Sequence, residues 1–165
     1  MKEGGIGGAN TITGLQFEKN TDFQQLLKKI PGYEIKNISG KSGECVFFDN
    51  VIVARCFKKY EFYKFLSENK INWKNLLSKR LLPDDALLVI IRETLFIIEV
   101  KYQQVAGSVD EKLQTCDFKR KQYLKLVSSL SLKVEYVYVL SEWFKNPAYK
   151  DVLDYIHMKM NMKPL

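Results

Sequence analysis

Two short apolar runs stand out along the chain, both after Pro83. Residues 86–91 (ALLVII) and 95–100 (LFIIEV) are rich in branched side chains, and the polar residues 92–94 separate them. Apolar runs of this length between polar segments are typical of strands that are buried on both faces of a sheet. They predict an antiparallel hairpin of two buried strands.

Helical periodicity is found in other stretches. Phe23, Leu26, Leu27 and Ile30 fall on one apolar stripe, and the helix-stopping pair Pro31-Gly32 follows them. This pattern predicts a first helix that ends before the proline. The expected helices cover about residues 14–30, 60–69, 108–130 and 148–160.

Capping and turn signals complete the predicted order of elements. Ser108 and Glu111 have the spacing of a capping box, so we expect the long helix to begin at Ser108. Asp49-Asn50 is typical of a hairpin turn. The further expected strands are 33–38, 45–48, 51–57 and 134–140. Strands that alternate with helices in this order predict an α/β fold, with a central mixed β-sheet flanked by helices.

The length of the chain indicates one domain. At ~150 residues per domain, 165 residues are expected to form a single domain, residues 1–165, with a core that needs no disulfide or metal. Five of the nine glycines lie within the first 14 residues. We therefore expect residues 1–13 to be flexible.

The cysteines and the apolar content bear on the cellular compartment. There are three cysteines and no CxxC spacing, which argues against a disulfide framework or a zinc site of cysteine pairs and fits a reducing compartment. The N-terminal residues lack the apolar segment of a secretory signal. No uncharged apolar run reaches the ~18 residues that a membrane span needs. The expectation is a cytoplasmic protein without a membrane segment.

Charged residues interrupt the second apolar run. Because side chains alternate along a strand, Glu99 and Lys101 share one face with Leu95 and Ile97. Buried strands rarely carry charges unless these are paired or bind a ligand. A short hairpin would also bring Asp84-Asp85 close to Glu99 and Lys101.

Such a cluster can do chemistry. Two neighbouring carboxylates repel each other and bind a hard divalent cation such as Mg²⁺. A lysine beside them can position or deprotonate a water molecule and neutralise charge on a phosphate. Together these groups suit the hydrolysis of a phosphodiester. The alternative is a salt bridge between Lys101 and an aspartate at the sheet edge, and the spacing alone leaves it open.

The same residues resemble a known motif. Pro83-Asp84 followed by Glu99-Val100-Lys101 resembles the PD-(D/E)xK nuclease superfamily, which includes many type II restriction endonucleases. Residues 14–18 (GLQFE) and the segment 95–123 are similar to one restriction-endonuclease branch of it. The likeness extends from about Gly14 to Tyr155. It implies a restriction-endonuclease-like core of a helix, a mixed sheet, a helix and a further strand.

The resemblance also implies roles for individual residues. Asp84, Glu99 and the backbone carbonyl of Val100 would be ligands of Mg²⁺, for which Mn²⁺ could substitute, and Lys101 would be the catalytic lysine. Asp85 is an alternative to Asp84. Adjacent strand residues point to opposite faces, so only one of the two should face Glu99, and the family pattern favours Asp84.

Three further polar residues match positions near such sites. Glu18 corresponds to a position that often adds an acidic group, and a solvated helix charge is the alternative. Gln104 and Gln103 follow the motif, where a glutamine can lie near the metal or a phosphate. For Gln103 we favour a polar strand end without such a role.

Basic residues are unevenly distributed. The net charge is +7, and residues 55–80 contain eight basic and two acidic residues, with aromatic residues between them. Basic segments contact phosphates, although a solvated face is an equal alternative. Core packing is the favoured role of these aromatic residues. The DNA-binding candidates are Lys58, Lys59, Lys64, Lys74, Lys79, Arg80, the helix start at Ser108, and Lys112 and Lys119 on the long helix.

These observations predict a Mg²⁺-dependent DNA endonuclease of the restriction type. Its partner would be double-stranded DNA. A homodimer is expected because twofold symmetry suits the cutting of both strands of a palindrome. The alternatives are a structure-specific DNA repair nuclease with the same site, a non-catalytic nucleic-acid-binding domain, and a basic structural domain with a plain ion pair.

Overall fold

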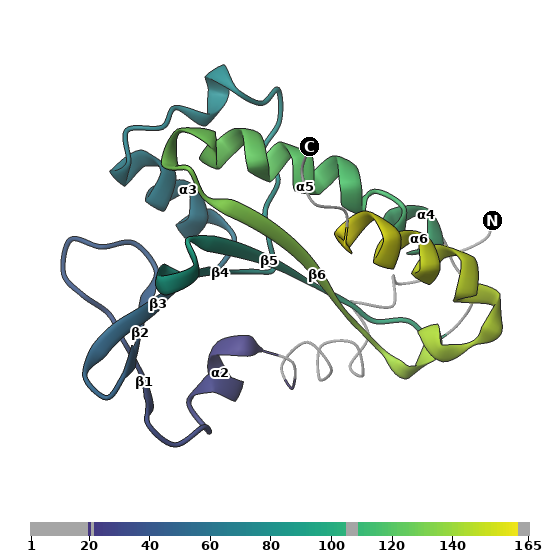
Figure 1. Cartoon of the computed structure of the whole chain (residues 1–165), viewed down its shortest axis with the longest axis horizontal. Coiled ribbons are helices and arrows are strands. Elements are labelled where there is room, and N and C mark those ends of the chain that lie inside the picture. Colours follow the sequence, from purple (N-terminus) through teal and green to yellow (C-terminus); the bar gives the residue numbers. More distant parts are fainter. Residues whose placement is uncertain (1–19, 21, 105–108, 162–165) are drawn as a thin grey trace, which may run out of the picture.

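A six-stranded mixed sheet forms the centre of the molecule. The computed structural model describes residues 20, 22–104 and 109–161 (Figure 1). The strands lie in sequence order, antiparallel from β1 to β5, and β6 pairs with β5 in parallel. Their bounds are β1 Tyr33–Lys36, β2 Glu44–Phe48, β3 Val51–Phe57, β4 Asp85–Val89, β5 Thr94–Lys101 and β6 Lys133–Leu140.

Helices flank the sheet, as the sequence predicts. In Figure 1, α3, α4, α5 and α6 lie on one side of the sheet, and the short α2 lies on the other. The helix bounds are α2 Phe23–Leu27, α3 Tyr60–Glu68, α4 Val109–Leu113, α5 Cys116–Val127 and α6 Lys150–Asn161. The predicted α/β class with a helix-flanked mixed sheet is therefore confirmed. No helix in the described part of the chain is both long and apolar enough to cross a membrane.

The predicted hairpin of two buried strands is present. β4 and β5 pair antiparallel, with Asp85 opposite Ile98 and Val89 opposite Thr94. A short 3₁₀ turn, Ile90–Arg92, connects them. The Asp49-Asn50 turn between β2 and β3 is also confirmed, since both residues have positive φ, as two-residue hairpin turns require.

Two predicted helices are wrong in their extent. The helix expected over 108–130 is broken into α4 and α5, and at the break the Thr115 hydroxyl donates to the Lys112 carbonyl at 2.7 Å. Of the helix expected over 14–30, the described part is α2. It follows the N-cap Asp22, whose carboxylate accepts a hydrogen bond from the Gln24 backbone N–H, and it ends at Leu27 instead of residue 30. Residues 1–19, which contain the expected flexible segment, lie outside the described residues.

The main core lies between the sheet and the helices α3 and α5. It is built around aromatic rings of the basic segment, with Phe57 and Phe62 fully buried and Phe65 nearly so. Phe62 meets Tyr123 of α5 edge to face, with ring centroids 5.7 Å apart. The expectation that these aromatic residues pack in the core is confirmed for Phe57, Phe62 and Phe65.

A glycine pair in the β1–β2 connection allows a direct stability test. Both Gly40 and Gly43 have positive φ, but only at Gly43 would a Cβ atom lie 2.2 Å from the Cys56 carbonyl oxygen. We expect Gly43→Ala to lower the free energy of unfolding by about 3 kcal/mol or more, from strain plus the clash. Gly40→Ala, which meets nothing within 4 Å, should cost about 1 kcal/mol from backbone strain alone. Denaturant unfolding measures both, and equal losses would contradict the clash.

Candidate active site

Strand alternation places the motif side chains of β5 on the core side of the sheet. Leu95 and Ile97 are fully buried beneath the helices, and Glu99 follows on the same face with an exposed fraction of only 6%. Lys101 is the last residue of the strand, and its side chain is partly exposed. The carboxylate of Glu99 is thus deep, while the lysine lies between it and the solvent.

Asp84 joins this face from the neighbouring strand. It immediately precedes β4, and its Oδ2 accepts a hydrogen bond from the Val100 backbone N–H at 3.0 Å. The same oxygen lies 3.9 Å from the Lys101 Nζ. The hairpin therefore brings the aspartate that precedes β4 to Lys101 at the end of β5, and Lys101 in turn contacts Glu99.

The Lys101 ammonium lies among the three oxygens that the resemblance implies as metal ligands. Its Nζ is 3.0 Å from Glu99 Oε2, 3.3 Å from the Val100 carbonyl oxygen and 3.9 Å from Asp84 Oδ2. An ammonium and a hard divalent cation favour the same kind of oxygen ligands. All three oxygens thus lie within 3.9 Å of one positively charged group.

Lys119 of α5 is the residue whose place the sequence analysis missed. Its Nζ lies 2.9 Å from Glu99 Oε1 and 3.0 Å from Oε2. It was expected to contact DNA from a basic helix face, but its ammonium is paired with the buried carboxylate. Helical spacing could have indicated this, because Lys119 lies three residues after buried Cys116 and four before buried Tyr123.

Glu99 stays ionised in this setting. Burial by itself would raise its pKa, but the charge of Lys101 and the hydrogen bonds from Lys119 outweigh it, so the net pKa is lowered. Burial, followed by the charge of Glu99, raises the pKa of the Tyr136 hydroxyl, which keeps it protonated. The cluster therefore holds a buried anion between two ammonium groups and a phenol.

Asp85 lies on the opposite face of the sheet. It is buried, and its Oδ1 has no hydrogen-bond partner among the described residues. Burial raises its pKa to about 6, with the Lys58 ammonium acting against the shift and the carboxylates of Asp22 and Asp84 adding to it. Because adjacent strand residues alternate, Asp84 and not Asp85 faces Glu99, which agrees with the choice that the motif favours.

The remaining predicted site residues are placed as follows. Gln103 is buried just past β5, where its backbone N–H and carbonyl both bond the Ser141 hydroxyl, at 3.2 and 3.1 Å. Its side-chain amide has no partner within the part of the chain described. Gln104 is exposed at its side chain. Glu18 and Ser108 lie outside the described residues, so their predicted roles are not addressed.

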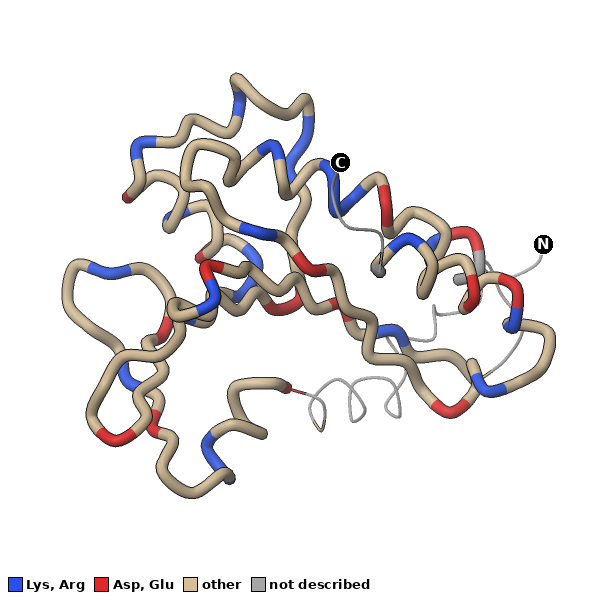
Figure 2. The backbone as a smooth tube through the Cα atoms, in the orientation of Figure 1, with Lys and Arg blue, Asp and Glu red and all other residues tan. Residues whose placement is uncertain are grey.

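The DNA-binding candidates divide into paired and exposed groups. Lys58 is half-buried and forms an ion pair with Asp22 at 2.5 Å, which leaves it a poor phosphate contact. The Lys59 backbone N–H donates to the Pro83 carbonyl at 3.1 Å, so the start of the basic segment adjoins Asp84. Figure 2 shows Lys and Arg around α3 and the loop after it. The exposed candidates are Lys59, Lys64, Lys74, Lys79, Arg80 and Lys112.

Arg120, the neighbour of the predicted DNA contact Lys119, does not add to a basic surface on α5. Arg120 is buried, and its Nε donates to the Val134 carbonyl of β6 at 3.1 Å. It therefore fastens α5 to the edge strand instead of facing solvent. Lys121 next to it is exposed and pairs with Asp117 at 2.8 Å.

Two carboxylates and one main-chain carbonyl form the whole donor set. Within residues 20, 22–104 and 109–161, no three His, Cys, Asp or Glu side chains gather closely enough to hold a metal by themselves. A cation bound by Asp84 and Glu99 would complete its shell with the Val100 carbonyl and water, as Mg²⁺ usually does.

In comparisons with known proteins, no family model matches the chain, and no curated protein or solved structure is significantly similar to it.

Proposed function

We propose that the protein is a metal-dependent DNA endonuclease with a restriction-endonuclease-like core of the PD-(D/E)xK type. The observation that carries this proposal is the convergence of Asp84, Glu99 and the Val100 carbonyl on the Lys101 ammonium. These are the residues that the resemblance implies for metal binding and catalysis. The observed α/β fold, a mixed sheet flanked by helices, supports the proposal of such a core.

The donor set fits a hard divalent cation. Two carboxylates and a carbonyl supply only oxygen ligands, which suits Mg²⁺ and, as a substitute, Mn²⁺. The two ammonium groups at Glu99 balance the charge of the two carboxylates in the absence of a metal. When bound, Mg²⁺ would supply charge neutralisation and Lewis acidity at the scissile phosphate.

The side chains of the chain itself divide the remaining tasks. Lys101, at the mouth of the cluster, can hydrogen-bond a water molecule or the charged phosphate oxygens. Lys119 contacts both oxygens of Glu99 and so fixes the orientation of that carboxylate. The Val100 N–H does the same for Asp84. Lys119 is thus a positioning residue, whereas Lys101 touches the reacting groups.

Double-stranded DNA is the proposed substrate. Exposed basic residues of the segment 55–80 begin beside Pro83, next to Asp84, and would contact phosphates near the cleaved bond. Cutting both strands with one site per chain favours a twofold-symmetric homodimer, which we propose as the active form.

Supercoiled plasmid and bacteriophage DNA test the proposal. With Mg²⁺ we expect discrete fragments, and with EDTA no cleavage. Discrete fragments favour the restriction type, whereas cutting confined to flaps, nicks or mismatches would indicate a repair nuclease instead. DNA binding without Mg²⁺- or Mn²⁺-dependent cutting on any of these substrates would overturn the enzymatic proposal and indicate a binding domain.

A further inference from the structure

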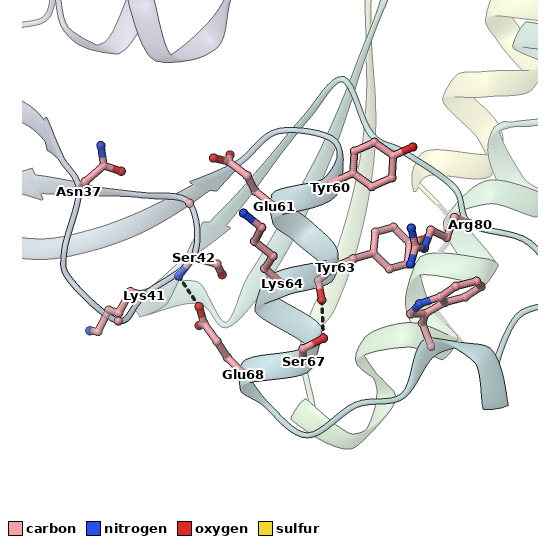
Figure 3. A pocket seen from close by; sticks show the side chains of 13 residues that line it. Asn37, Lys41, Ser42, Tyr60, Glu61, Tyr63, Lys64, Ser67, Glu68 and Arg80 are labelled. Carbon is pink, nitrogen blue, oxygen red and sulfur yellow. Dashed lines mark hydrogen bonds between the residues drawn. The ribbon is translucent and has the colours of Figure 1, made fainter.

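A solvent-open groove of about 800 Å³ lies beside α3, and Asp84 and Glu99 are not among the residues that line it. Figure 3 shows its walls, which are the connection between β1 and β2 on one side and the segment that ends at Arg80 on the other. The exposed side of α3 forms its floor. The residues that matter for its chemistry are Lys41, Ser42, Tyr60, Lys64, Trp73 and Arg80.

Two of the cations that line the groove are lysines. Lys41 and Lys64 are exposed, and neither forms an ion pair with any described residue. Both lysines line the groove, so a polyanion that lies in it could pair with each ammonium group. The groove is therefore suited to a negatively charged ligand.

The two carboxylates of the groove, Glu61 and Glu68, are outnumbered by its three cations, and Glu68 is already paired with a cation outside the lining. Glu68 accepts from the Ser42 backbone N–H and pairs with Arg55 at 3.0 Å. Partial burial opposes ionisation of Glu68, yet the hydrogen bonds from Ser42 and Arg55 lower its pKa. Glu61 accepts from the Lys58 backbone N–H at 2.9 Å. Glu68 thus links α3 to the connection between β1 and β2, and Glu61 binds the backbone just before α3.

A third cation of the groove, Arg80, packs against aromatic rings. The Arg80 guanidinium lies 4.7 Å from the ring centroid of Trp73, 5.4 Å from that of Tyr63 and 5.7 Å from that of Tyr60. The Tyr63 hydroxyl bonds both the N–H and the carbonyl of Leu81, at 2.8 and 3.0 Å. Arg80 is exposed despite these contacts. The rings therefore restrict where the guanidinium lies, while its N–H groups stay accessible to a ligand.

The groove adjoins the candidate active site along the chain. Arg80 precedes Asp84 by four residues, and the backbone N–H of Lys59, next to Tyr60, bonds the Pro83 carbonyl. A strand of DNA that reaches Asp84 could therefore continue past Arg80 toward Lys64 and Lys41. Nucleic acid is the extended polyanion that matches a broadly open, cationic groove.

We propose that this groove binds the phosphodiester backbone of DNA outside the cleaved bond, through Lys41, Lys64 and Arg80. The inference rests on the proposed function in taking nucleic acid as the ligand. It assigns a contact to Lys41, which precedes the basic segment 55–80, and it gives Tyr60 and Trp73 the role of holding Arg80.

Binding in EDTA separates this inference from cleavage. We compare the wild-type chain with Lys41→Gln/Lys64→Gln, using a fluorescent 30-base-pair duplex and its single strand over a range of salt concentrations. The slope of log K against log salt should fall by about 2 for the duplex, close to one unit per lost phosphate contact. Affinity should fall about tenfold or more at 0.1 M salt.

A matched control carries the same change in net charge. Lys145→Gln/Lys150→Gln removes two exposed lysines that are paired with Glu142 and Asp154 near α6, at the far end of the molecule in Figure 1. It should leave the slope within about 0.5 of wild type. Equal slopes for the two double variants would overturn the inference, as would a slope change seen with the single strand alone.

Arg80→Lys gives an independent readout of the aromatic contacts. It keeps the charge but removes the planar group over the three rings, and we expect weaker duplex binding with little change in the salt slope. Unchanged affinity would contradict the role given to the rings.

Thermal unfolding of every variant shows whether it is folded. If Lys41→Gln/Lys64→Gln loses duplex binding and the wild type shows no Mg²⁺-dependent cutting, the groove inference is supported and the enzymatic proposal is overturned.

Discussion

Lys101→Ala is expected to reduce Mg²⁺-dependent DNA cleavage by at least about 100-fold, while duplex binding in EDTA is retained. The Lys101 ammonium is the only cation that contacts Glu99, the Val100 carbonyl and Asp84 together within the described part of the chain. Its loss removes the proposed proton-handling and charge-stabilising group. Binding should persist because the groove lysines and Arg80, which make the proposed phosphate contacts, are untouched.

The control for this variant is Lys145→Ala, which removes an exposed lysine paired with Glu142. It should cut DNA at the wild-type rate. Gel analysis of plasmid cleavage gives the rates, and circular dichroism shows whether the variants are folded. Undiminished cleavage by Lys101→Ala would contradict the catalytic assignment of Lys101 and leave the plain ion pair as its role.

Local patterns predicted the part of the fold on which the site depends. The period of two along residues 95–102 placed Glu99 and Lys101 on one face, and the short polar separator made the hairpin of β4 and β5 predictable. Asp49-Asn50 likewise predicted the turn between β2 and β3. Each of these features depends on residues close together in sequence, which is why the sequence alone was sufficient.

Contacts between distant segments were not predictable in the same way. The pairing of Lys119 with Glu99 joins residues 20 positions apart on a helix and a strand. Arg120 lies in the basic run Lys119-Arg120-Lys121, which is typical of an exposed helix face, but the packing of α5 on β6 buries it. The break near Thr115 also escaped prediction, because a hydroxyl that bonds the Lys112 carbonyl is compatible with either a continuous or an interrupted helix.

The charge network itself favours a functional role over a structural one. The contacts with Lys101 and Lys119 keep the buried Glu99 carboxylate ionised, but taking these charges out of water costs free energy, and buried ion pairs are often no more stable than well-packed apolar side chains. An apolar group of similar volume would pack beneath α5 without that cost. A cluster that keeps one carboxylate buried and another half-exposed beside a lysine is therefore better explained by binding a cation or phosphate than by stability.

Asp84→Asn and Asp85→Asn should differ sharply, although the two residues are adjacent. Asp84→Asn removes a proposed ligand charge but leaves an amide oxygen that can still accept from the Val100 N–H. We expect roughly 100-fold slower cleavage and clearly weaker Mn²⁺ binding, because a hard cation depends on carboxylate charge. Asp85→Asn alters the opposite face of the sheet and should cut DNA within about threefold of wild type.

Cleavage assays in Mg²⁺ and Mn²⁺ titrations followed by electron paramagnetic resonance measure both effects. The adjacent variants serve as controls for each other, since each replaces one carboxylate by its isosteric amide at the start of β4. Slow cleavage by Asp85→Asn with normal cleavage by Asp84→Asn would show that the wrong aspartate has been assigned. Normal Mn²⁺ binding and cleavage by Asp84→Asn and by Glu99→Gln would remove the metal site from the proposal altogether, because no other described carboxylate faces the Lys101 ammonium.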